Sequence, residues 1–235
     1  RVHDRRNRLG RGPRSTAVGL GKLQRRLART APSGANLQPG LLHVLTGPAL
    51  ANLTGGLARA IADGAEPVAE YSYFPDPMPA PLKARQRAAG HALYQALGIG
   101  RRDLQGRRDQ FARNYAFFGA PVGIVVTIDR AMGAGCFMDL GMSVMSLPLA
   151  AEAAGLVATG IGALANYGPV VHRLLDLPPE EMVVCGIAIG WADPDAPENR
   201  VRTAREDLAA FACPNRAFFI CFDYDSKAET RKNVN

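Results

Sequence analysis

The polar residues best suited to ligand chemistry gather in one short loop, residues 31–39. Ser33, Asn36 and Gln38 stand there among prolines and a glycine, between a basic run and an apolar, strand-like run. Proline, glycine, serine and asparagine crowded between two ordered elements are typical of a loop with special backbone geometry. Side-chain amides offer donors and an acceptor, which suits the edge of a heteroaromatic ring or a sugar-like chain. A plain helix-to-strand turn is the simpler interpretation, and the local chemistry leaves both open.

A second candidate is the segment Gly160-Ile161-Gly162-Ala163-Leu164-Ala165, which matches the GxGxxG/A dinucleotide fingerprint. The chain left after Ala165 holds only one strong strand, which is too little for the βα units of a complete Rossmann domain. A dinucleotide-binding Rossmann domain is therefore the weaker interpretation. Backbone N–H groups at a glycine-rich helix start would still favour anionic or electron-rich ligand atoms.

The other side chains give no pattern for metal binding or nucleophilic catalysis. The four histidines and four cysteines lack HExxH, CxxC and Cys/His metal spacings, and the chain has no GxSxG elbow or P-loop. The polar set that remains consists of Ser33, Asn36, Gln38, Asn114, the Gly160 loop and arginines near both ends. Hydrogen-bonding groups and cations without an acid–base pair predict a cofactor that brings its own chemistry.

Charge is concentrated at the start of the chain. Of the net charge of +7, residues 1–30 contribute ten basic residues against one acid, and the rest of the chain is close to neutral. Such an arm could bind nucleic acid or an anionic surface, but a solvated tail is at least as good an interpretation, and we expect no nucleic-acid partner. The unpaired cysteines predict a reduced, cytoplasmic protein, and no apolar run approaches the ~20 residues of a membrane span.

Hydrophobic periodicity predicts alternating helices and strands around one core. The expected strands cover 41–46, 121–129, 155–159 and 182–189, and the expected helices cover 22–29, 48–62, 82–97, 103–118, 138–154 and 168–175. The proline-rich residues 64–81 are expected to form a long connection, because proline disrupts regular helix. Its aromatic residues, Tyr71, Tyr73 and Phe74, could cover a flat ligand or simply pack on the surface.

The helix expected at 138–154 combines a methionine stripe with an alanine-rich side. Small residues let a neighbouring helix approach closely. This helix is therefore expected to be deeply buried or to lie across a two-fold axis at a subunit interface, where a charge at Ala151 would disrupt assembly.

Several segments together resemble the FMN-dependent nitroreductase family. They are Ala-Pro-Ser-Gly-Ala-Asn-Leu-Gln-Pro at 31–39, Pro-Leu-Lys-Ala-Arg at 81–85, Leu-Tyr-Gln-Ala-Leu-Gly-Ile at 93–99, Asn-Tyr-Ala-Phe-Phe-Gly-Ala-Pro at 114–121, Met-Asp-Leu-Gly at 138–141, Leu-Ala-Ala-Glu-Ala-Ala-Gly-Leu at 149–156, Gly-Ile-Ala-Ile-Gly at 186–190 and Asp-Pro-Asp-Ala-Pro-Glu-Asn-Arg-Val-Arg-Thr-Ala-Arg at 193–205. They occur in family order over most of the chain, which makes the series specific.

The resemblance implies an α+β fold with a central, mostly antiparallel sheet flanked by helices, and an intertwined homodimer with FMN in its interface clefts. It divides the chain into a basic arm (1–21), one flavin-binding domain (22–212) and a divergent tail (213–235). The residues that it implies in cofactor binding are Arg5, Arg6, Arg8, Pro32, Ser33, Gly34, Asn36, Gln38, Asn114, Gly160, Ile161, Gly162, Arg202 and Arg205.

The activity implied is an FMN-dependent oxidoreductase. NAD(P)H would donate a hydride, and a nitroaromatic, quinone or related small molecule would accept electrons by a ping-pong mechanism. No side chain is assigned a catalytic role, because N5 of the flavin would carry the hydride. The alternative is a non-catalytic flavin-binding protein, or a nucleic-acid-associated protein in which the basic arm matters most.

Overall fold

A computed structural model describes residues 2–3 and 29–212 of the chain. The chain divides into two units, residues 1–201 and 202–235. The first unit holds the sheet and the helices that cover it. In the second unit, the described residues form one short helix, α7 (Leu208–Phe211). Arg5, Arg6 and Arg8, which were predicted to bind the cofactor, lie outside the described residues. The helix predicted at 22–29 also lies outside them, except for Arg29.

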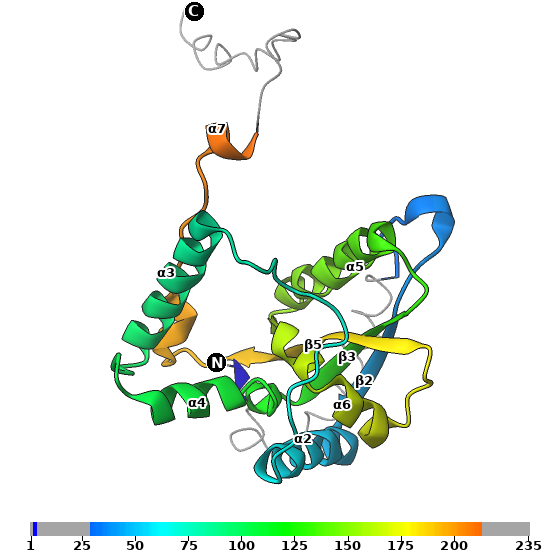
Figure 1. The fold of residues 1–235 in the computed structure, drawn as a ribbon, viewed down its shortest axis with the longest axis horizontal. Coiled ribbons are helices and arrows are strands. Elements are labelled where there is room, and N and C mark those ends of the chain that lie inside the picture. Colours follow the sequence, from blue (N-terminus) through cyan, green and yellow to red (C-terminus); the bar gives the residue numbers. More distant parts are fainter. Residues whose placement is uncertain (1, 4–28, 213–235) are drawn as a thin grey trace, which may run out of the picture. The chain divides into compact units, whose positions relative to one another are not determined.

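The sheet of the first unit is antiparallel in every strand pair. Its order is β1-β5-β3-β2, and β4 also pairs with β5 (Figure 1). The long strand β5 therefore forms hydrogen bonds with three other strands. The strands are β1 (Val2–His3), β2 (Leu41–Thr46), β3 (Val122–Asp129), β4 (Val157–Ile161) and β5 (Glu181–Ala192). The α+β fold with an antiparallel sheet, expected from the family resemblance, is confirmed.

Residues of β3 alternate between two buried faces, which is why this strand reads as one continuous apolar run. Val125 packs in one core cluster with Val183 of β5 and with residues of the helices on that side. Ile124 and Val126 pack in a second cluster, together with Ile187. Helices must therefore cover both faces of the sheet.

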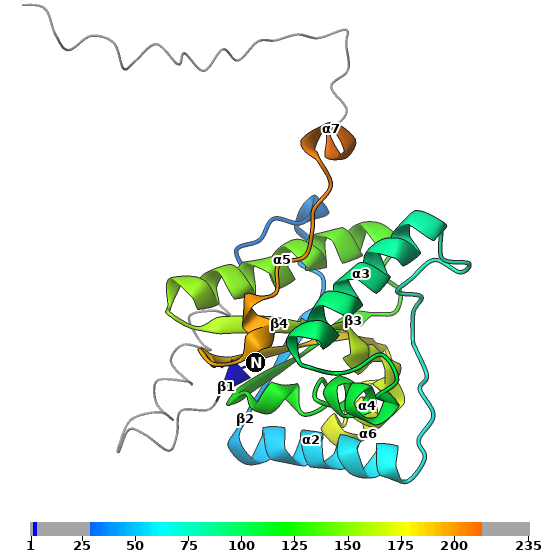
Figure 2. The same ribbon diagram turned by 90° about the vertical axis from the view of Figure 1, so that its left-hand side faces the viewer.

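Helices α2 (Gly47–Ala62) and α6 (Gly168–Leu175) cover the first face (Figure 2). Proline near the first helical position begins each helix, where a missing N–H costs nothing. The two helices approach closely, because a Cβ added at Gly56 would lie 2.5 Å from the Leu174 side chain. The helix predicted at 48–62 is confirmed with its start one residue earlier, and its Leu53 and Leu57 are almost fully buried.

Helix α5 (Ala134–Ala153) covers the opposite face (Figure 2). Leu140, Leu147 and Ala151 are buried against the sheet. The stripe Met138, Met142, Met145 and Leu149 is instead 43–72% exposed in the protomer. Among the described residues, α5 is the one helix long and apolar enough to span a membrane by length and composition, but its inner face is part of the core.

Helices α3 (Ala80–Ala96) and α4 (Leu104–Ala112) follow the proline-rich connection and have no buried residue. The predicted helix 103–118 ends earlier than expected. Phe117 and Phe118 take left-handed φ values of 47° and 53°, which break the helix into a turn around η3 (Phe117–Gly119). Strand β4 runs two residues further than predicted, to Ile161, where it pairs with Gly186. In the arm, Val2–His3 pairs with the end of β5 rather than being irregular.

Candidate functional site

The loop of residues 31–39 has an unusual backbone. Ala35, Asn36 and Gln38 all have positive φ, between 49° and 58°, and a short 3-10 helix, η2 (Gly34–Asn36), lies within it. Left-handed conformations are costly for residues with a Cβ, and least so for asparagine. Such residues cluster at functional sites, where the surrounding structure holds them in place.

Hydrogen bonds hold the loop in this shape. The backbone N–H of Gln38 donates to the Ser33 Oγ at 2.9 Å, and the Gln38 side-chain amide donates to the Asn36 carbonyl at 3.3 Å. The N–H of Gly34 donates to Asp139 Oδ2 of α5 at 2.9 Å. In the part of the chain that the structure describes, the Asn36 side chain makes no such bond and is exposed. Ser33 and Asp139 therefore brace the loop, while Asn36 faces outward.

The loop borders a cavity of about 310 Å³. Its charged lining groups are Arg29 and Asp139, and its neutral polar groups include Ser143 of α5. The cavity is open to solvent at the surface of the protomer, and its size is at the lower end of small-molecule pockets. Its lining residues are Arg29, Ala31, Pro32, Ser33, Gln38, Pro39, Gly40, Leu41, Leu42, Asp139 and Ser143.

The glycine-rich segment divides between a strand and a 3-10 helix. Gly160 and Ile161 end β4; Ile161 as a whole residue is only 1% exposed, whereas Gly160 is exposed. Gly162 begins η4 (Gly162–Asn166). A second cavity, of about 460 Å³, opens there. It is lined by Ala69, Tyr71, Ser72, Tyr73, Phe74, Phe111, Gly162, Ala163, Ala165 and Asn166.

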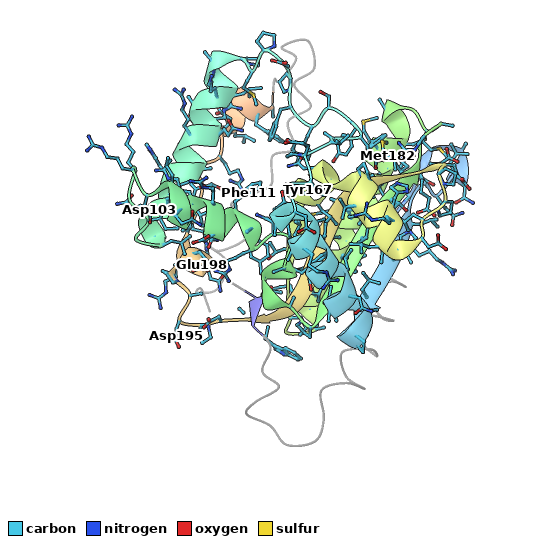
Figure 3. The ribbon with its side chains drawn as sticks, turned by 60° about the horizontal axis from the view of Figure 1, so that its bottom comes forward. Asp103, Phe111, Tyr167, Met182, Asp195 and Glu198 are labelled. Carbon is cyan, nitrogen blue, oxygen red and sulfur yellow. The ribbon has the colours of Figure 1, made fainter. Side chains whose placement is uncertain are left out.

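Asn114 lies at a third cavity, of about 330 Å³, next to the end of α4. Its side-chain amide donates to the Phe111 carbonyl at 2.7 Å, so part of its hydrogen-bonding capacity serves the helix end. Phe111 lines both this cavity and the second one. Phe111 and Tyr167, both labelled in Figure 3, each contact Tyr115 edge to face, with ring centroids 5.9 Å and 5.0 Å apart.

Five of the predicted residues of the first unit line one of these three cavities, whereas Gly34, Asn36, Gly160 and Ile161 line none of them. Pro32, Ser33 and Gln38 line the first, Gly162 the second and Asn114 the third. Arg202 and Arg205 belong to the second unit. There Arg205 bonds to the Thr203 hydroxyl at 2.6 Å. The assignment of all of these residues to one cofactor site remains a prediction.

Sequence analysis missed two groups of polar residues. Asp139 is the acid that anchors the loop; the segment Met-Asp-Leu-Gly at 138–141 contains it, but no role was assigned to it. The other group lies within the sheet. His43 Nε2 is 2.8 Å from Glu181 Oε2, and the Thr127 hydroxyl donates to the same oxygen at 2.5 Å. These three residues come from three strands, so no spacing along the chain could reveal their contact.

The aromatic connection beside the second cavity is anchored to β5. The Tyr71 hydroxyl donates to the Val184 carbonyl at 2.7 Å. Burial, together with the neighbouring Cys185 and Tyr73, raises the pKa of Tyr71 to about 12. Tyr71 is therefore a neutral hydrogen-bond donor at physiological pH. Among the described residues, no group of three or more His, Cys, Asp and Glu side chains could hold a metal ion.

Comparison with protein families gives two matches. The model of the nitroreductase family matches residues 22–191, which include both the loop of residues 31–39 and the glycine-rich segment. A domain of unknown function, DUF3854, matches residues 181–235.

Characterised relatives cover most of the chain. The chain is 34% identical over 213 residues to a chloronitrobenzene nitroreductase of Comamonas testosteroni, which covers 89% of this chain and 93% of the relative. It is also 34% identical over 186 residues to a 4-nitrobenzoate reductase of Pseudomonas putida, with 79% and 81% covered.

Solved structures of nitroreductases are also similar to this chain. The FMN- and NADPH-dependent nitroreductase NfnB of Sphigopyxis sp. strain HMH has a TM-score of 0.81 and 35% identity, covering 87% of this chain and 91% of that one. The FMN-dependent nitroreductase NfnB of Mycobacterium smegmatis, solved with NADPH, has a TM-score of 0.77 and 27% identity, covering 86% and 89%.

Proposed function

Because the chain belongs to the nitroreductase family, we propose that it is an FMN-dependent oxidoreductase that uses NAD(P)H to reduce nitroaromatic compounds. The relatives that share a third of its residues are named for nitroaromatic substrates. Quinones and related small molecules are further acceptors that such an enzyme would take. The structural observation that supports the proposal best is the loop of residues 31–39, where three non-glycine residues take left-handed conformations.

The residues of the loop fit a flavin better than they fit a substrate that needs acid–base catalysis. The exposed Asn36 amide can donate and accept, and the Ser33 hydroxyl accepts from Gln38 while its own proton remains to donate. Neutral donors can stabilise a partly anionic ring without adding a fixed charge. Bound FMN would supply hydride transfer at its N5 atom. The chain's own residues would bind, orient and cover the ring.

The phosphate end of FMN needs cations. Arg29 lines the cavity beside the loop. We assign Arg202 and Arg205, together with Arg5, Arg6 and Arg8 of the arm, to the phosphate, since guanidinium groups form strong charge-assisted bonds to phosphate. Asn114 and the backbone at Gly160, Ile161 and Gly162 complete the proposed site.

A homodimer would bring these parts together. The protomer leaves the stripe of α5 exposed, with Met138 72% and Leu149 61% exposed, and helices α3 and α4 bury no residue at all. Helices gain most of their stability from packing an apolar face. A second copy of the chain that covers α5 would account for the exposed stripe. We place the enzyme in the cytoplasm, in line with the free cysteines Cys136 and Cys185.

Steady-state kinetics test the proposed reaction. The FMN-loaded protein is assayed with NADPH and nitrobenzene, each varied at several fixed concentrations of the other. A ping-pong enzyme gives parallel double-reciprocal lines, because the oxidised nicotinamide leaves before the nitroaromatic acceptor binds. Absence of turnover with NADPH and with NADH would leave the non-catalytic flavin-binding alternative, and co-purification with nucleic acid would support the other alternative.

A further inference from the structure

A single carboxylate ties the proline-rich connection to the rest of the first unit. The Glu70 side chain is only 8% exposed, and a buried charge is costly unless it is paired and hydrogen-bonded. Its Oε2 atom accepts from the Val183 N–H at 2.8 Å. Its Oε1 atom bonds to Arg130 and lies 3.6 Å from His172 Nε2. Glu70 is therefore held from β5, from α6 and from the turn that follows β3.

A bulge in β5 explains why backbone groups are available there. The register of β5 against β3 shifts by one residue at Val184. An extra residue of this kind leaves part of the ladder unpaired, and bulges are frequent beside active sites. Side chains of the connection bond to the backbone at this point. Glu70 accepts from the Val183 N–H, and the Tyr71 hydroxyl donates to the Val184 carbonyl.

The Glu70 carboxylate also packs against the first residue of α6. A Cβ added at Gly168 would lie 2.7 Å from the carboxyl carbon of Glu70, far inside ordinary contact. Glycine at this position leaves the space that the carboxylate fills. Glu70 thus joins the start of α6 to the bulge of β5.

The connection lies along the glycine-rich segment and its continuation, residues 162–168. The Val68 N–H donates to the Asn166 carbonyl at 2.7 Å. A Cβ added at Gly162 would lie 3.2 Å from Tyr73 Cε2. The connection therefore contacts this segment near its start and near its end, and Glu70 fixes the connection between these contacts to the sheet.

We propose that Glu70 is a positioning residue for the glycine-rich segment, whose backbone at Gly162 we assign to the cofactor. Backbone groups bind a ligand well when the surrounding residues hold them in the productive place. The apparent affinity falls in proportion to the fraction of molecules in which the site is formed. Loss of the carboxylate removes charge-assisted hydrogen bonds, which are the strong kind, so the segment would leave its binding position in part of the molecules.

Two substitutions break the contact from opposite sides. Glu70→Ala removes the carboxylate, and Gly168→Ala puts a methyl group into the space that the carboxylate fills. The atoms that meet this methyl group belong to a flexible side chain, so the carboxylate moves away and the fold is kept. Glu70→Gln keeps the shape and an acceptor for the Val183 N–H, and Arg130 is 42% exposed, so its charge can be hydrated.

Two further variants are controls. Glu66→Ala removes an acid from an exposed position of the same connection. Ile128→Val lowers stability through a small cavity in the other core cluster. The FMN dissociation constant of each full-length apoprotein is measured by fluorescence quenching. Hydrogen exchange before FMN is added reports how well the backbone amides of residues 162–168 are protected.

Glu70→Ala and Gly168→Ala are each expected to raise the FMN dissociation constant by about 3- to 10-fold, which corresponds to a formed site in roughly 10–30% of the molecules. The double variant should bind FMN no more weakly than the weaker single variant, because both changes break one contact. Exchange should become faster at residues 162–168. Glu70→Gln should lie closer to the parent than Glu70→Ala does, and Glu66→Ala and Ile128→Val should bind FMN as the parent does.

This inference rests on the proposed function for the identity of the ligand, but the two fail separately. An FMN dissociation constant in Glu70→Ala equal to that of the parent would overturn the inference and leave the proposed function standing. Additive losses in the double variant, or an equal loss in Ile128→Val, would also overturn it. If FMN affinity falls as expected but the parent oxidises neither NADPH nor NADH, the proposed function fails while this inference stands.

Discussion

At the scale of single residues, the loop of residues 31–39 separates bracing groups from binding groups. Ser33 and Asp139 are occupied in holding the loop, whereas Asn36 carries an exposed amide on a left-handed backbone. Replacing Asn36 by alanine would have two effects. It removes the side-chain amide, and it strains the backbone, because alanine tolerates positive φ poorly. Asn36→Gly removes the amide and keeps the conformation, and Asn36→Ala removes the amide and adds strain.

We expect Asn36→Gly to bind FMN about 5- to 100-fold more weakly, from the ~1–3 kcal/mol cost of an unpaired polar group in the cleft. Its apoprotein should melt close to the parent, while that of Asn36→Ala should melt lower. Fluorescence-quenching titration of apoprotein with FMN, beside thermal melts, measures both. If Asn36→Gly binds FMN as tightly as the parent, the loop is scaffolding and the site assignment built on it is wrong.

The raised pKa of Tyr71 predicts that the folded protein loses stability at alkaline pH. Its pKa is raised to about 12 in the folded protein from 10.0. Below pH 10 the tyrosine is neutral in both states and its contribution is intact. As the pH rises from 10 towards 12, only the unfolded chain ionises, so folding becomes less favourable. The free energy of unfolding should therefore fall more steeply between pH 10 and 12 in the parent than in Tyr71→Phe, measured by urea unfolding. Parallel curves would contradict this account.

At the scale of elements, α5 has a core face and an exposed face, and only the structure assigns them. The helix was expected either to be deeply buried or to face a partner, and its Ala151 is fully buried in the core of its own protomer. A charge at Ala151 would therefore disrupt folding and say nothing about assembly. The exposed side is the methionine stripe. The spacing of these residues in the sequence indicates that they share one face of the helix, but it does not indicate whether that face points to the core or to solvent.

Leu149→Arg is accordingly the sharper test of the dimer. An arginine on the exposed stripe should leave the protomer folded and shift sedimentation from dimer to monomer, because an unpaired charge cannot be buried at low cost. Leu104→Arg is the matched control, since Leu104 and Leu149 are each 61% exposed but Leu104 lies on α4. A Leu149→Arg protein that sediments as the parent does would exclude the stripe as the interface.

Hydrophobic periodicity predicted correctly the helices and strands that are buried on one face or on all sides. Strand β2, helix α2 and helix α6 lie within a residue of their expected bounds, because hydrophobic spacing and flanking proline or glycine fix them. Helix α4 was predicted too long, since the sequence does not reveal that Phe117 and Phe118 adopt left-handed conformations. Contacts between distant strands, such as that of His43 with Glu181, could not be predicted, because nothing local encodes them.

At the scale of the whole molecule, the family resemblance named the fold and the activity, and the comparisons confirm both at that level. Five of the predicted site residues line one of three cavities in the protomer, and Arg202 and Arg205 belong to the second unit. A single cofactor cleft for them is part of the proposal, and it would require the proposed homodimer. The proposed role of the arm arginines in binding the FMN phosphate does not depend on the dimer. It can be tested by replacing Arg5, Arg6 and Arg8 while keeping the Val2–His3 strand.

The measurement that tests the central claim most directly is anaerobic spectroscopy of the purified protein reconstituted with FMN. We predict that the visible flavin absorbance of the bound cofactor disappears when NADPH or NADH is added and returns when nitrobenzene follows. Repeating the cycle with free FMN controls for the uncatalysed reaction. A protein that binds no FMN, or whose bound flavin absorbance is unmoved by both nicotinamides, would contradict the assignment as an FMN-dependent nitroreductase.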